Sequence, residues 1–335
     1  MAVTVVRARY VQMGQQSAFD TPVAATVRYP GVITFNEEVD YYEVPGPQQV
    51  RGMTAGQLVN TRNHTTFQYH SELTYEEMLT WLLAGLLGTV TASGVGADKT
   101  WTFTPPVAGD PVPKYYTFEF APYDWTTKYL RAVPNCLISK ITITIPINAP
   151  CMIDVEGFGG KPAIGGTPTA SMANATGREV AKGNLAKIFI DTSGAGIGGT
   201  QKSATVISQK ITIETGLRPD FTQDGRTGLD YGKYLATDVM MSNEMTFEHE
   251  ATAAAEIAAW RAGTKRFIRS QVTGSTVSSL PKTINLDACY EYVQATKIGE
   301  NNGNDIITLI GRSAYDPTWA KIMVATVINA LATAP

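Results

Sequence analysis

The clearest change of pattern along the chain lies between Thr65 and Gly88. Residues 66–69 alternate polar and apolar side chains, which is the period of a half-buried β-strand. From Thr74 onward the apolar residues recur at spacings of three and four, which predicts an amphipathic helix. The stretch therefore predicts a strand that passes directly into a helix whose apolar face lies on a sheet.

Both ends of this helix carry sequence signals. Thr74 is a good N-cap residue, and Glu77 follows three positions later, as in a capping box. Leu73 and Met78 flank the cap and can form a hydrophobic staple. Gly88 is the residue expected to end the helix, because glycine readily adopts the left-handed conformation at helix C-termini.

The same order of patterns returns in the second half of the chain. Residues 246–263 again read as a strand followed by a helix. Residues 246–247 match residues 66–67, both Thr-Phe, at an offset of 246 − 66 = 180, and Trp260 matches Trp81 at 260 − 81 = 179. Such a return favours a tandem duplication over two unrelated β-rich domains.

Most other periodic segments alternate like strands, so the fold class is expected to be mainly β. Cys136–Asn148 is the clearest strand, and Pro146 indicates its end or a sheet edge. We expect two tandem β-sandwich or barrel domains, each with one flanking α-helix, with long loops or hairpins and a Gly-rich linker. The predicted organisation is an N-terminal arm at 1–30, a first domain at 31–160, a linker at 161–184 and a second domain at 185–335.

Composition supports sizeable cores and argues against a nucleic-acid binder. The chain has 335 residues, of which 44% are hydrophobic and 17% are charged, and its net charge is −3. An acidic chain lacks the basic field that drives tight nucleic-acid binding. The chain contains an odd number of cysteines, three, at spacings that do not suggest a metal site, and they are interpreted as buried free thiols. Neither a secretion signal nor a stretch long enough to cross a bilayer is visible, which predicts a protein that is made in the cytosol and stays soluble or assembles there.

Catalytic and cofactor signatures are weak or missing. Residues 194–199, GAGIGG, match the dinucleotide fingerprint by letter, but the β-branched segment after them predicts no helix. His64 and His70 are six residues apart on one expected strand, too far to share a metal ion. We therefore expect no enzyme activity, no metal and no cofactor.

Two features carry a known resemblance. The stretch TFQYHSELTYEEMLTWLLAGLLG, and later CLISKITITI followed by a Gly-rich stretch, resemble the tail tube (major tail) proteins of long, non-contractile-tailed bacteriophages. Leu73–Gly88 and Cys136–Ile141 carry the match. The resemblance implies a β-sandwich or barrel with a flanking helix, six domains per ring, and rings stacked into a tube through which double-stranded DNA passes.

The chain is about twice as long as single-domain members of that family. The excess suggests two fused tube domains, so that three chains would supply six quasi-equivalent domains per ring; a ring of six chains is the alternative. The implied partners are further copies of the chain, the tape measure, terminator and distal tail proteins, and passing DNA without specific binding. A membrane is not among them. The implied location is the virion tail, after synthesis in the host bacterial cytoplasm.

Two sets of residues are candidates for these roles. An acidic run at a strand end suits a lumen that repels DNA, although an ordinary solvated strand end explains it equally well. Its members are Glu37, Glu38, Asp40 and Glu43. The long loops at 40–61 and 215–237 are candidates for contacts between rings. The residues proposed there are Arg51, Gln57, Asp224, Arg226 and Tyr231.

Two other classes of protein remain open. One is another tail or injection-machine component, such as a distal tail, terminator or contractile inner-tube protein. The other is a cell-surface β-domain adhesin, against which the missing secretion signal and the odd cysteine count argue.

Overall fold

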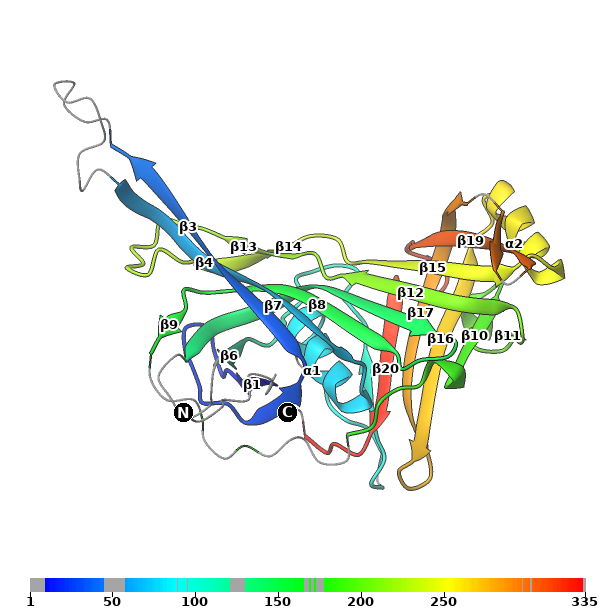
Figure 1. Cartoon of the computed structure of the whole chain (residues 1–335), viewed down its shortest axis with the longest axis horizontal. Helices are drawn as coiled ribbons and strands as arrows, with labels where there is room; N and C mark the ends of the chain where they lie inside the picture. The colour runs from blue at the N-terminus through cyan, green and yellow to red at the C-terminus, as the bar shows by residue number, and fades with distance from the viewer. Residues whose placement is uncertain are drawn as a thin grey trace, which may run out of the picture.

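Antiparallel β-strands dominate the chain, and two α-helices lie among them in the described residues (Figure 1). The computed structural model describes residues 10–44, 58–88, 90–94, 96–120, 130–165, 169, 172, 178–296, 298–301 and 303–333. The mainly β fold class is confirmed.

The first half of the chain contains one helix, which follows the fourth strand. Its elements are β1 (Tyr10–Gln15), β2 (Val27–Pro30), β3 (Val32–Glu43), β4 (Leu58–Glu72), α1 (Tyr75–Gly85), β5 (Lys99–Phe103), β6 (Tyr116–Phe120), β7 (Arg131–Pro146), β8 (Met152–Gly159) and β9 (Ala163–Ile164).

The second half again has one helix, which follows a long strand. Its elements are η1 (Gly183–Leu185), β10 (Ala186–Asp191), η2 (Gly194–Gly196), β11 (Gln201–Lys202), β12 (Val206–Glu214), β13 (Leu217–Asp220), β14 (Lys233–Ala236), β15 (Met240–Glu248), α2 (Ala251–Arg261), β16 (Arg266–Thr276), β17 (Pro281–Ala295), β18 (Gly299–Asn301), β19 (Asn304–Ser313) and β20 (Met323–Asn329).

Strand pairing follows the same order in both halves. The first half pairs as β2-β1-β6-β7-β8-β4-β3. The second half pairs as β11-β10-β16-β17-β19-β15-β12. The strand before the helix has equivalent neighbours in each half: β4 lies between β8 and β3, and β15 lies between β19 and β12. The strand topology therefore repeats, with every pairing antiparallel.

The structural repeat has a different offset from the one read in the sequence. Both helices are 11 residues long, and Ala251 follows Tyr75 by 251 − 75 = 176 residues. With this offset Trp81 corresponds to Ile257, so matching Trp81 to Trp260 was wrong. The strand ladders agree, because the pair Phe35 and Phe67 shifts onto the pair of residues 211 and 243.

The two halves are joined by strand pairing as well as by the polypeptide chain that connects them. β7 pairs with β12 along seven residues of each strand, and β5 pairs with β20. One hydrophobic core cluster runs through both halves. The described part of the predicted linker also packs: Ala181 donates its amide to Leu73 and accepts one from Cys151. The described part of the predicted arm, from Tyr10, likewise lies inside the first half, where Val11 and Met13 are fully buried.

Helix α1 begins where the sequence predicts but is buried on every side. The Thr74 hydroxyl accepts the Glu77 amide at 3.2 Å and donates to the Glu77 carboxylate at 3.0 Å. All 11 residues of the helix are buried, so the prediction of an amphipathic helix with one exposed face was wrong. The reason is tertiary: α1 contacts β7 of the first half and also β17 and β20 of the second.

The end of α1 also differs from the prediction. The helix stops at Gly85, where the amides of Leu86 and Leu87 both donate to the Leu82 carbonyl, so Gly88 does not end it. Gly88 serves a close approach of two segments instead. A Cβ there would lie 2.7 Å from the Val112 carbonyl oxygen.

Candidate functional site

An eight-stranded antiparallel sheet crosses both halves and leaves one face open. Its order is β3-β4-β8-β7-β12-β15-β19-β17, and β18 continues β17 along β19. Figure 1 shows its central strands running across the molecule above α1. Side chains alternate between the two faces. One face packs on the core. The other presents mainly polar side chains and is open except near Phe158 and His64, which Tyr231 and Phe221 of the 215–237 segment cover.

The β7–β12 joint is the centre of this sheet. Its register runs from Lys140 opposite Glu214 to Pro146 opposite Ser208. The core side of the joint is apolar and fully buried, with Ile141 opposite Ile213 and Ile143 opposite Ile211. On the open side the hydroxyls of Thr142 and Thr212 lie 3.4 Å apart. Branched apolar cross-strand pairs stabilise such a ladder, so the halves are firmly tied at this point.

Carboxylates on the open face lie beside an imidazole or an ammonium group. His70 Nδ1 lies 2.6 Å from the Asp154 carboxylate, and Lys140 Nζ lies 2.9 Å from Glu156. All four side chains come from β4, β8 and β7 near the joint. Such half-exposed pairs contribute little stability, but they keep the local field of the face small.

The predicted acidic run does not form one surface. Glu38 and Asp40 lie on the open face, where Glu38 contacts Thr66 at 3.0 Å and His64 at 3.2 Å. Glu37 points to the opposite face and accepts a hydrogen bond from Asn63 at 3.0 Å. The alternation of β3 separates adjacent carboxylates in this way.

The outer part of β3 and β4 forms a two-stranded hairpin that projects from the sheet (Figure 1). Glu43 pairs with Leu58 at the far end of its described part, beyond a bulge between Asp40 and Tyr41. Large apolar side chains on the hairpin are exposed. They are Tyr41 (59%), Tyr42 (58%), Leu58 (50%) and Val59 (47%). Arg51 and Gln57, two of the predicted contact residues, lie outside the described residues.

The second predicted contact loop, residues 215–237, contains the hairpin β13–β14 and lies against the first half. Tyr231 is fully buried, and its hydroxyl donates to the Asn135 carbonyl. Leu217 and Phe158 belong to the same small apolar cluster. Tyr231 therefore anchors this segment within the chain. Sequence reasoning missed this contact because nothing near Tyr231 indicates which distant strand it meets.

Arg226 and Asp224 of this segment lie nearer the surface. The Arg226 guanidinium contacts the carboxylates of Asp20, Asp224 and Asp230 and lies over the Phe19 ring at 4.7 Å. Hydrogen bonding to Asp20 raises the pKa of Arg226, so it stays charged. The four-residue cluster ties the segment to the N-terminal part of the chain.

Candidate chemical sites have structural explanations. The Asp191 carboxylate accepts the amides of Gly198, Gly199 and Thr200 at 2.9 to 3.2 Å, so the glycine-rich loop already binds an anion of its own chain. No helix follows this loop before β11 and β12. His64 and His70 contact different carboxylates, those of Glu38 and Asp154.

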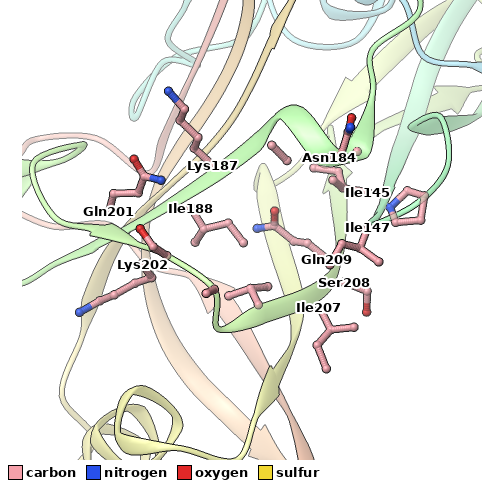
Figure 2. A pocket seen from close by; sticks show the side chains of 16 residues that line it. Ile145, Ile147, Asn184, Lys187, Ile188, Gln201, Lys202, Ile207, Ser208 and Gln209 are labelled. Atoms are coloured by element: carbon pink, nitrogen blue, oxygen red, sulfur yellow. The ribbon is translucent and has the colours of Figure 1, made fainter. Parts of the chain in front are cut away.

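A pocket of about 260 Å³ lies beside the end of the β7–β12 joint (Figure 2). Lys187, Gln201 and Lys202 stand at different sides of it, and Gln209 points between them. Gln209 donates to Asn243 at 3.0 Å and also to Ser270. The residues lining the pocket include no carboxylate, histidine or cysteine, so the pocket lacks a carboxylate or imidazole base and a typical metal ligand.

Comparison with protein families decides the class. A family model described as phage tail tube protein matches residues 7–315. The chain belongs to the phage tail tube family. No curated protein matches the chain. The match makes it a structural component of a phage virion.

Membership in this family fits the open sheet better than any pocket. A tail tube protein assembles with copies of itself and with other tail proteins, so it needs unpaired edges and exposed faces rather than a reaction centre.

The three cysteines, at 136, 151 and 289, are free and buried. Among the described residues no helix is long and apolar enough to cross a membrane.

Proposed function

We propose that this tail tube protein polymerises into stacked rings that form the conduit for DNA ejection. The observation that carries the proposal is the eight-stranded sheet, whose two end strands, β3 and the β17–β18 segment, each have an edge with no strand partner among the described residues. Exposed strand edges are a liability for a monomer, because they pair readily with other chains. In a ring the same edges are covered.

The open face of the sheet is the proposed lining of the channel. Duplex DNA binds through phosphates that are neutralised by Lys and Arg, so a conduit must avoid an uncompensated basic surface. On the open face acidic groups outnumber basic ones, so no uncompensated basic surface remains. The acidic groups on β3, β4, β7, β8, β12, β15 and β19 are Glu38, Asp40, Glu72, Asp154, Glu156, Glu214, Glu244 and Glu248, and the basic ones are Arg62, Lys140, Lys210 and Arg312. The proposed lining therefore includes Glu38 and Asp40 of the predicted acidic run but leaves out Glu37.

Each chain supplies two domains to a ring of three chains. The repeated strand order supports six quasi-equivalent positions per ring, whereas six chains would give twelve. A sheet of eight strands per chain gives a barrel of 3 × 8 = 24 strands when three chains close.

Ring stacking is assigned to the projecting β3–β4 hairpin. Its exposed Tyr41, Tyr42, Leu58 and Val59 offer apolar area that a neighbouring ring can bury. Tyr231 is left out of this contact because it is buried within the chain, and Arg226 and Asp224 become secondary candidates. The tape measure, terminator and distal tail proteins are the proposed partners at the tube interior and ends.

Electron microscopy of the purified protein tests the proposal. Tubes with a central channel are expected, together with ring-sized particles of three chains in native mass spectrometry, 3 × 36.1 = 108.3 kDa. A particle of 6 × 36.1 = 216.6 kDa would replace the trimer by a hexamer. Isolated rings that never stack would favour a terminator or distal tail protein, and monomers at high concentration would contradict ring assembly.

A further inference from the structure

The eight-stranded sheet contains one joint between the halves, formed by β7 and β12. Its two free edges belong to the strands that correspond to β12 and β7 in the other half. β12 lies between β15 and β7, whereas β3, its counterpart, pairs only with β4 among the described strands. β7 pairs with β6 as far as Cys136 and then with β12 from Lys140. β17 pairs with β16 as far as Tyr290, and on that same side the described residues beyond it have no strand partner.

The two halves correspond residue by residue on both sides of the joint. An offset of 176 carries β3 onto β12, as the helices and ladders above establish. For β7 and β17 the offset is 154, because the bulge after Ile138 in the β7–β8 ladder recurs after Tyr292 in the β17–β19 ladder (292 − 138 = 154). Shared bulges are reliable markers of register, since each changes which side chains face the core.

We infer that β3 of one chain pairs antiparallel with residues 294–296 and 298–300 of a second copy, in the register of the internal β7–β12 joint. Applying the two offsets to that joint places Asn36 opposite Thr296 of the second copy, where the internal joint has Thr212 opposite Thr142. Glu38 then lies opposite Gln294, and Val32 opposite Glu300. The inference rests on the proposed ring and names the surface that closes it.

The side chains of the two edges are compatible with pairing, but they form a weaker contact than the side chains of the internal β7–β12 joint. On the open side, Asn36 opposite Thr296 replaces the Thr142–Thr212 pair, so a polar pair remains at the centre. On the core side, Phe35 and Glu37 stand where β12 has Ile211 and Ile213, and Ala295 stands where β7 has Ile141. The joint between chains therefore buries less apolar area than the joint within a chain, and it dissociates first.

The contact is head to tail, because an edge of the first half meets an edge of the second. Such a contact generates either a closed ring or an open helical filament. The occupant is a second copy of this chain, since the internal joint already displays the complementary pairing. Three copies alternate three internal joints with three joints between chains.

Disulfide trapping tests the register. The full chain carrying Asn36→Cys and Thr296→Cys places the new thiols directly opposite one another between chains, where Cβ atoms are roughly 5 Å apart. The native cysteines are buried and do not compete. On mild oxidation of the assembled protein, non-reducing gels are expected to show covalent species of up to three chains. Asn36→Cys with Gln294→Cys is the matched control, shifted by two residues, and is expected to cross-link weakly because diagonal Cβ atoms lie about 7 Å apart or more.

The outcomes separate this inference from the proposed function. Tubes that form normally while Asn36→Cys/Thr296→Cys gives no cross-link, or while the shifted control cross-links better, would overturn the register and leave the tube function standing. Cross-linking by Asn36→Cys alone would overturn the head-to-tail contact. Failure of the unmodified chain to form rings would instead contradict the proposed function.

Charge substitution gives a second, independent readout. Lysines at both positions (Asn36→Lys, Thr296→Lys) oppose like charges at every joint between chains, and ring formation is expected to need on the order of tenfold more protein. Asn36→Glu with Thr296→Lys opposes unlike charges and is expected to restore it. Gln68→Lys, an exposed residue on an interior strand of the same face, controls for added charge. Equal assembly of the two double variants would contradict the pairing.

Discussion

The two halves of this chain share a strand order but support it with different helices. Helix α1 is buried along its whole length, and its N-terminus is capped by the Thr74 side chain. Helix α2 has only Ala253, Glu256 and Ala259 buried, and no side chain caps its N-terminus. It lies at one end of the molecule and contacts β17 (Figure 1).

The cores differ in the same sense. The first half packs aromatic rings around Trp81, whereas the second half buries Gln209, Asn243 and Ser270 in one hydrogen-bonded group. The comparison teaches that strand topology can repeat while the side chains that stabilise it diverge. The first half holds the centre of the molecule, because α1 is covered by strands of both halves.

Among substitutions that test this difference between the halves, the largest loss of stability is expected at Trp81. Its ring packs 4.8 Å from Tyr69 and 6.2 Å from Phe118, measured between centroids. Trp81→Ala is expected to lower the free energy of unfolding by about 3–5 kcal/mol. Ile257→Ala, the corresponding change in α2, is expected to cost roughly 1 kcal/mol because Ile257 is partly exposed. Denaturant unfolding of the unassembled chain measures both, and equal costs would contradict the difference in burial.

The buried carboxyl of Glu77 makes the next largest difference between the helices. Burial raises the pKa of Glu77 to about 7, against the opposing effect of Arg178 at 3.3 Å. A raised carboxyl pKa means that the folded state holds its proton more tightly than the unfolded chain. The contribution of this group is therefore complete below the unfolded pKa and is lost as pH rises through the folded pKa.

Stability should accordingly fall between about pH 4.5 and pH 7, by up to about 3 kcal/mol from this group. Glu77→Gln is expected to flatten that fall, whereas Glu72→Gln, an exposed change at the end of β4, should leave it as in the unmodified chain. Chemical denaturation across this pH range measures the slopes. A Glu77→Gln protein with an unchanged slope would assign the pH dependence elsewhere.

Helix capping gives a smaller contrast. Thr74→Ala removes the acceptor of the Glu77 amide and is expected to cost about 1–2 kcal/mol. Glu250→Ser supplies α2 with a cap that it lacks and is expected to add roughly 0.5 kcal/mol. Thermal unfolding of the two variants should shift in opposite directions. A loss of stability in Glu250→Ser would show that Glu250 has another role.

The smallest expected effect on stability comes from the projecting hairpin. Deleting residues 46–56 leaves Val44, Pro45 and Gln57 between Glu43 and Leu58, which are already paired. Three-residue hairpin connections are common, so the shortened chain should fold with nearly unchanged stability and still form rings. Adding Tyr41→Ser and Leu58→Ser to the deletion removes exposed apolar side chains assigned to stacking. Stacking should then be lost, and electron microscopy would show rings without tubes. Normal tubes would remove the hairpin from the inter-ring contact.

Local signals in the sequence were read correctly where neighbours within a few residues decide the structure. The Thr74 cap, its contact with Glu77 and the start of α1 follow from such spacing. The alternation of β7, its end at Pro146 and the failure of the glycine-rich loop to start a helix are of the same kind.

Other features depended on partners far away in the chain. The outer side of α1 is buried by β20 and β17, which lie about 200 residues later in the chain. The sequence pattern predicts one buried face, whereas the structure buries both. The true offset of the repeat appeared only in the ladders, because short matches such as Thr-Phe shift easily by a few residues. Tyr231 read as a surface loop residue until Asn135 and Phe158 were found beside it.

The sequence by itself determined the β-rich class, the first helix and the family resemblance, since periodicity, caps and composition are local properties of the chain. Only the tertiary structure decided that β7 pairs with β12 and that Glu37 and Glu38 face opposite ways. It also decided which two edges of the eight-stranded sheet have no strand partner among the described residues. These features follow from strand order and register, which are fixed by packing between segments that the sequence does not place together.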